Sequence, residues 1–117
     1  MIYVQPLWIR SPDYLVDPVM RDDQIGETVK ATLRQLAKLA PGRAIEVRIP
    51  PYAAVQCGEG PIHARGTPPN TIEMSAQTWL ALARGSRTWE EAVSSGEVRA
   101  SGVRADLSPY LPLEGLR

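Results

Sequence analysis

A chain of 117 residues with 13 basic and 13 acidic side chains is the length of one domain and carries no net charge. This balance excludes the broad basic surface on which nucleic-acid binding depends. No apolar run reaches the roughly 18 residues that cross a bilayer. With a single cysteine and no basic start to its apolar N-terminus, the chain is expected to be cytoplasmic and free of disulfides.

Residues 1–16 are predicted to form an extended apolar arm. Residues 2–4 have the side chains of a short strand, which Pro6 interrupts. Residues 7–9 (Leu-Trp-Ile) are too apolar for a free tail. We therefore expect the arm to pack on the rest of the protein or on a second subunit.

A long amphipathic helix is predicted next. Its apolar residues recur at helical spacing, at Ile25, Val29, Leu33, Leu36 and Ala40. The helix can begin at Asp17-Pro18, where a capping acid precedes proline, or later, near Asp22. Acidic residues near its start and basic residues near its end suit the helix dipole, and Pro41-Gly42 ends it.

A block rich in strands follows the helix. Alternating apolar residues predict a half-buried strand over residues 44–49, which Pro50-Pro51 ends. Glycine and proline punctuate the rest of the block, as is typical of turns between strands. The further strands are predicted over residues 52–57, 62–65, 71–74 and 97–100, with turns at 58–61 and 66–70.

Two short helices and a final helical turn are predicted in the last third of the chain. Ser75 can cap the first helix, and Gly85 ends it. Thr88 with Glu91 three residues later is the capping-box pattern of the second. Asp106 can cap the final turn. The residues expected to face the interior from the two short helices are Trp79, Leu82, Ala83, Trp89, Ala92 and Val93.

The C-terminal third resembles the second half of a sterol-carrier-protein domain. The frame that carries this resemblance is Trp79-x-x-Leu82-Ala83-x-Gly85, Trp89-x-x-Ala92, Gly96-x-Val98, Ser101-Gly102 and Ala105-Asp106-Leu107. Residues 41–51 and 65–70 are similar to a group of small actinobacterial proteins of that family. The resemblance implies an α+β fold over residues 17–117, with a curved, mostly antiparallel sheet of about five strands and helices packed on one face.

The resemblance also implies a non-enzymatic protein that binds a hydrophobic small molecule, such as a fatty acyl chain or a sterol, between helices and sheet. Apolar burial would drive binding. Arg65 is the candidate that could hold a carboxylate or phosphate at the mouth of the pocket, although a solvated strand arginine explains it as well. The residues expected to surround the pocket are Leu33, Leu36, Val55, Ile72, Met74, Trp79, Leu82, Trp89 and Val93.

Two other classes of function remain open. The large side chains of Trp79 and Trp89 can fill a core as readily as they line a cavity, so the chain can instead be a solid accessory domain that dimerises or docks through its arm. Cys57 and His63 lie on neighbouring predicted strands, but no third residue orients them for catalysis. We expect Cys57 to be a small buried hydrophobe, His63 a surface residue, and the chain to need no metal or cofactor.

Overall fold

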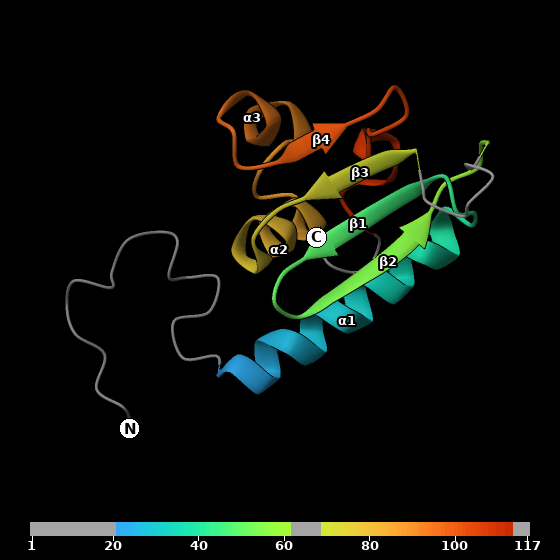
Figure 1. Cartoon of the computed structure of the whole chain (residues 1–117). Helices are drawn as coiled ribbons and strands as arrows, with labels where there is room; N and C mark the ends of the chain where they lie inside the picture. Colours follow the sequence, from blue (N-terminus) through green and yellow to red (C-terminus); the bar gives the residue numbers. More distant parts are fainter. Residues whose placement is uncertain (1–20, 62–68, 114–117) are drawn as a thin grey trace.

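The structure, a computed structural model of the chain, describes residues 21–61 and 69–113. In this part of the chain a four-stranded sheet is covered by helices on one face (Figure 1). The predicted arm over residues 1–16, the predicted strand over 62–65, and the residues His63 and Arg65 lie outside the described residues.

Helix α1 (Asp22–Leu39) begins at the later of the two predicted starts. The backbone of Arg21 is still extended, and its N–H donates to Oε1 of Gln24 at 3.0 Å. Acidic side chains in the first turn and Lys38 in the last turn suit the helix dipole, as predicted. The predicted apolar face is confirmed, because at most 2% of the surface is exposed for Val29, Leu33 and Leu36.

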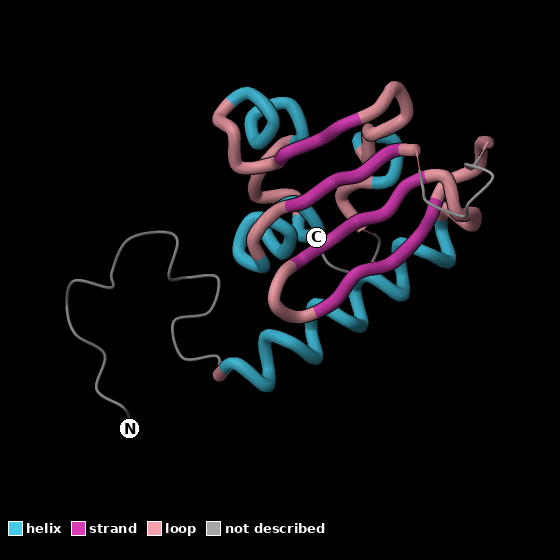
Figure 2. Tube along the Cα trace, viewed as in Figure 1, coloured by secondary structure: helices cyan, strands magenta, loops and turns pink. Residues whose placement is uncertain are grey.

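The sheet is mixed and runs in the order β2-β1-β3-β4 (Figure 2). Its strands are β1 (Ile45–Ile49), β2 (Ala53–Cys57), β3 (Asn70–Glu73) and β4 (Arg99–Ser101). β1 pairs with β2 as an antiparallel hairpin, β3 runs parallel to β1, and β4 is antiparallel to β3. The predicted α+β class is confirmed, but the parallel β1–β3 pair was not predicted, and the described residues contribute fewer strands than expected.

The strand register separates an apolar face of the sheet from a polar one. Val47 of β1 lies opposite Val55 of β2 and Ile72 of β3, and these side chains face the helices. Because side chains alternate along a strand, the positions between them face the other side. That other face carries charged residues, among them Glu46 and Arg48, which are joined by an ion pair of 2.7 Å.

Helix α2 (Ala76–Arg84) begins and ends at its predicted signals. Oγ of Ser75 accepts the backbone N–H of Thr78 at 3.1 Å, which satisfies one of the free donors of the first turn. Gly85 ends the helix with a φ of 86°, in the left-handed region that favours glycine. Six of its nine residues are buried, so α2 is anchored along most of its length.

Helix α3 (Trp89–Ser94) follows after a short turn and has the predicted capping box. Thr88 Oγ1 accepts the N–H of Glu91 at 3.1 Å, and Glu91 accepts the N–H of Thr88 at 3.0 Å. The hydrogen bond from the Thr88 backbone lowers the pKa of the Glu91 carboxyl. Only Ala92 is buried among the residues of α3.

The start of β3 is tied to the segment after β4 by a buried asparagine. Asn70 is 2% exposed, its Nδ2 donates to the Ala44 carbonyl at 2.9 Å, and its Oδ1 accepts the N–H of Arg104 at 2.9 Å. Gly102, with a φ of 109°, passes so close that an added Cβ would lie 2.2 Å from this oxygen. The chain then forms the short 3-10 helix η3 (Ser108–Tyr110), whose N-cap is Leu107 and not the predicted Asp106. Asp106 precedes the cap and accepts the N–H of Ser108 at 2.9 Å.

The helices and the apolar face of the sheet enclose one hydrophobic cluster. Its fully buried members include residues from all three α-helices and from the three longer strands, and Leu107 and Leu113 join it from the C-terminal segment. Within residues 21–61 and 69–113, no helix is both long and apolar enough to cross a membrane. This layer and the hollows at its margin are the candidate locations of a functional site.

Candidate functional site

Most of the predicted ligand-binding residues meet inside the layer between helices and sheet. They come from α1, from β3 and the residue that follows it, and from α2, and each is at most 3% exposed. This group consists of Leu33, Leu36, Ile72, Met74, Trp79 and Leu82. Their burial suits both roles predicted for them, the packing of a core and the lining of a ligand site.

A buried hydrogen bond joins the two helices that cover this layer. Nε1 of Trp79, in α2, donates to Oγ1 of Thr32, in α1, at 2.8 Å. The Thr32 hydroxyl in turn donates within its own helix, to the Thr28 carbonyl at 2.8 Å. Because Trp79 is fully buried and Thr32 is 5% exposed, this bond holds α2 against α1 in a position where water cannot replace either partner.

The remaining predicted residues lie at the margin of the layer or beyond it. Val55 and Trp89 are partly buried and pack against the cluster. Val93 differs from the expected interior position, because it is 40% exposed and lies outside the cluster. The physical reason is the orientation of α3, because Trp89 and Ala92, three residues apart, share the side that packs on the cluster, and Val93 lies off that side. Arg65, the candidate for the pocket mouth, falls outside the described residues.

Two adjoining hollows open beside α2 and α3, and together we call them the polar groove. Their volumes are about 420 and 410 Å³, and they share Ser75 and Glu97. The first is also lined by Gln77, Thr78, Ala81 and Arg87, and the second by Pro50, Glu73, Met74, Gly96 and Arg99. The groove thus lies where the start of α2, the end of β3 and the two ends of α3 come together.

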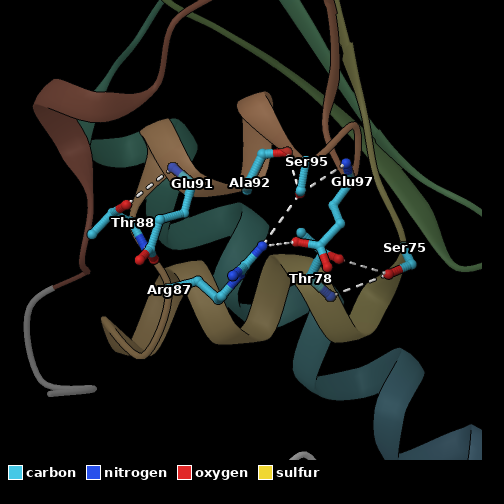
Figure 3. A network of polar contacts seen from close by, with 8 residues as sticks. All are labelled: Ser75, Thr78, Arg87, Thr88, Glu91, Ala92, Ser95 and Glu97. Atoms are coloured by element: carbon cyan, nitrogen blue, oxygen red, sulfur yellow. Dashed lines mark hydrogen bonds and ion pairs between the residues drawn. The ribbon is translucent and has the colours of Figure 1, made fainter.

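An arginine and a glutamate from opposite ends of α3 meet in the groove (Figure 3). Nη2 of Arg87, which precedes the helix, donates to Oε1 of Glu97, which follows it. The same nitrogen donates to Oγ of Ser95 at 3.3 Å. The side chains of Arg87 and Glu97 are 34% and 45% exposed, so the pair is open to solvent. Ion pairs of this kind contribute only about 0.2–1 kcal/mol to stability.

A second charged pair lies in the adjoining hollow. Nη2 of Arg99 in β4 lies 2.8 Å from Oε2 of Glu73 in β3. Opposite charges on facing residues of an antiparallel pair stabilise the register of the two strands. Each arginine of the groove therefore has its own carboxylate partner, and the groove as a whole is electrically balanced.

Met74 connects the polar groove with the hydrophobic layer. It is 3% exposed and belongs to the buried cluster, yet it also lines the second hollow. Among the described residues that were predicted to bind a ligand, Met74 is the one that also lines the polar groove. A thioether side chain is flexible and adapts to different packing. The packing between the hydrophobic layer and the polar groove is therefore most adaptable at Met74.

The sequence did not reveal the polar groove. Arg87 and Glu97 are ten positions apart in the chain, and no helical or strand spacing relates them. They meet because α3 is short and Gly96, with a φ of 83°, turns the chain back toward β4. The turn signals at Gly85 and Gly96 mark the two ends of the segment that contains α3, but they do not predict which side chains this segment brings together.

Cys57 has the environment of a structural residue. Its side chain is fully buried at the end of β2, and burial raises the pKa of its thiol to about 11. The thiolate, which is the reactive form, is therefore scarce at neutral pH. The prediction that Cys57 is a small buried hydrophobe is confirmed. In the part of the chain that the structure describes, no three His, Cys, Asp or Glu side chains gather as metal ligands would.

The fold and site define a small α+β domain with one apolar layer and a polar groove at its edge. A family model described as "Bacterial SCP ortholog" matches residues 21–113. The chain therefore belongs to this sterol-carrier-protein-like family, as the resemblance of its C-terminal third predicted. No curated protein shows a significant match to the chain.

Proposed function

We propose that the protein is a non-enzymatic binding or carrier protein for a hydrophobic small molecule, such as a fatty acyl chain or a sterol. The observation that supports this most is the continuous apolar layer, which adjoins the polar groove at Met74. An amphipathic guest needs an apolar space next to a polar opening, and here the two adjoin. Membership of a sterol-carrier-protein-like family supports the same class of function.

The chain's own side chains fill the described layer, so a guest has to displace some of them. Helix α2 resists such displacement because six of its nine residues are buried. Helix α3 buries Ala92 alone and is held at its ends by the exposed pair of Arg87 and Glu97. We therefore expect the cover to open at α3, next to Met74, with about 25 cal/mol gained for each Å² of guest surface removed from water.

Ligand binding is tested with cis-parinarate, a fluorescent fatty acid, excited through tryptophan. Energy transfer from Trp79 and Trp89 is expected to rise in a saturable way as the probe enters the layer. Native mass spectrometry of the freshly purified protein should detect a co-purified lipid. Absence of both signals would contradict the proposal.

A pair of matched variants locates the binding space. Ala83 is fully buried in the layer, whereas Ala54 is exposed on the polar face of the sheet. Ala83→Leu overfills the layer and should weaken probe binding, while Ala54→Leu should not. Circular dichroism checks that both variants are folded. Equal affinities for wild type and both variants would place the guest elsewhere.

A second candidate function is a solid accessory domain that docks or dimerises through the arm over residues 1–16. The hydrogen bond between Trp79 and Thr32 favours it, because this bond holds the two covering helices in a closed arrangement. Deletion of residues 1–10 should then convert an oligomer to a monomer in light scattering. An unchanged molecular mass would rule this candidate out.

A further inference from the structure

The arginine of the polar groove is only partly used by its partners. Both Ser95 and Glu97 accept from the same nitrogen of Arg87, Nη2. A guanidinium presents five N–H donors in a planar fork, and a carboxylate can engage two of them side by side. The remaining donors of the fork are not taken by these two residues, and the side chain is 34% exposed at the hollow.

Glu97 occupies the place that a ligand carboxylate would take. Its carboxylate reaches Arg87 from the far end of α3, and its side chain is 45% exposed. Exposed pairs of this kind are weak, so an incoming carboxylate can replace the glutamate at little cost. A neutral head group that displaced Glu97 would break the ion pair with Arg87 without forming a charge-assisted hydrogen bond in its place.

Arg87 is the cation that lines the first hollow, whereas Arg99 lines the second. Arg99 is engaged by Glu73 at 2.8 Å, within the strand pairing of β3 and β4. The polar side chains nearest to Arg87 in the first hollow, those of Ser75 and Thr78, are uncharged and bond to each other at 3.1 Å. After the backbone hydrogen bond from Thr88, the Arg87 guanidinium also contributes to the lowered pKa of the Glu91 carboxyl. A monoanion therefore meets one guanidinium, neutral hydroxyls and this second acid once Glu97 has moved aside.

We infer that Arg87 binds the carboxylate of a long-chain acid by exchanging it for Glu97, while the apolar chain of the ligand enters the layer past Met74. The inference rests on the proposed function, and it specifies the ligand class as an anionic amphiphile. The first hollow, of about 420 Å³, holds the head group, and Met74 lines the adjoining hollow at the edge of the buried cluster.

The experiment compares cis-parinarate with its methyl ester, which has the same chain but no charge, at pH 8. Wild type should bind the acid about two- to fivefold more tightly than the ester, because the bond to the exposed guanidinium is made to the acid alone. Arg87→Gln should remove this preference and leave the affinity for the ester unchanged. Arg87→Lys, which keeps the charge without the fork, should give an intermediate preference.

Two further variants sharpen the result. Glu97→Gln removes the competing carboxylate and should tighten acid binding about two- to fivefold without changing ester binding. Arg48→Gln is the matched control, because Arg48 forms the same kind of pair with Glu46 on the opposite face of the sheet. It should leave the acid preference intact.

Failure of this inference and failure of the proposed function give different results. Equal binding of acid and ester by wild type, or a preference that survives in Arg87→Gln, would overturn the role of Arg87 but leave a hydrophobic ligand site in place. A preference lost equally in Arg48→Gln would overturn it too, because general charge would then explain the effect. If neither probe binds, the proposed function falls, and this inference falls with it.

Discussion

Helices α2 and α3 follow one another in the chain and begin with similar caps, yet they are held in the structure very differently. Ser75 caps α2 and Thr88 caps α3, in both cases by accepting a backbone N–H three residues later. Six of nine residues are buried in α2, but only Ala92 is buried in α3. Caps set where a helix starts, whereas burial sets how firmly it is anchored, and this difference makes α3 the less firmly anchored part of the cover.

The largest effect is expected from truncating the tryptophan of α2. Trp79→Ala should lower the free energy of unfolding by about 3–5 kcal/mol, because it empties a fully buried site. Val93→Ala, on the exposed side of α3, should change it by at most about 0.5 kcal/mol. Urea denaturation followed by circular dichroism measures both. Similar losses in the two variants would contradict the difference in anchoring.

The next effect concerns the hydrogen bond between α1 and α2. Thr32→Val keeps the shape of the side chain but leaves the buried Nε1–H of Trp79 without its acceptor, which should cost about 1–3 kcal/mol. Thr28→Val is the control, because the Thr28 hydroxyl bonds only to the Gln24 carbonyl within α1. A loss no larger than that of the control would show that the bond does not hold α2 in place.

Removing the two caps compares the helices directly. Ser75→Ala should lower the free energy of unfolding by about 1 kcal/mol, since α2 unfolds with the core. Thr88→Ala should have a smaller global effect but should speed hydrogen exchange of the α3 amides, because α3 can open locally. Exchange measured by mass spectrometry or NMR separates the two cases. Unchanged exchange over residues 89–94 in Thr88→Ala would show α3 to be as firmly held as α2.

The smallest effect is expected from the ion pair across α3. Glu97→Gln removes the carboxylate that Arg87 contacts, and exposed pairs of this kind are worth about 0.2–1 kcal/mol. The loss should shrink further in 1 M salt, which screens exposed charges. Thermal unfolding at low and high salt measures it. A large loss that persists in salt would mean that Glu97 is a structural anchor and cannot be exchanged for a ligand.

Local signals in the sequence predicted much of the fold. The caps at Ser75 and Thr88, the terminating Gly85 and the apolar face of α1 were all correct, because each depends on residues within a few positions of one another. The choice between two starts for α1 was settled by the extended backbone of Arg21. Six of the predicted ligand-binding residues meet in one layer, as apolar periodicity and the resemblance to the sterol-carrier-protein family together predicted.

The features that escaped prediction all depend on contacts between distant parts of the chain. The parallel pairing of β1 with β3 requires a crossover, and no local pattern states which edge a strand will join. The outward position of Val93 reflects how α3 sits on the sheet, which its own apolar spacing does not reveal.

Where each element begins, and which of its faces is apolar, could be derived from the amino-acid order, since neighbouring residues govern caps, turns and periodicity. Packing in three dimensions was needed to bring Arg87 and Glu97 together and to set Met74 between the core and the groove. The side chains of a binding site lie close together in space even where they are far apart along the chain, so local sequence patterns do not identify them.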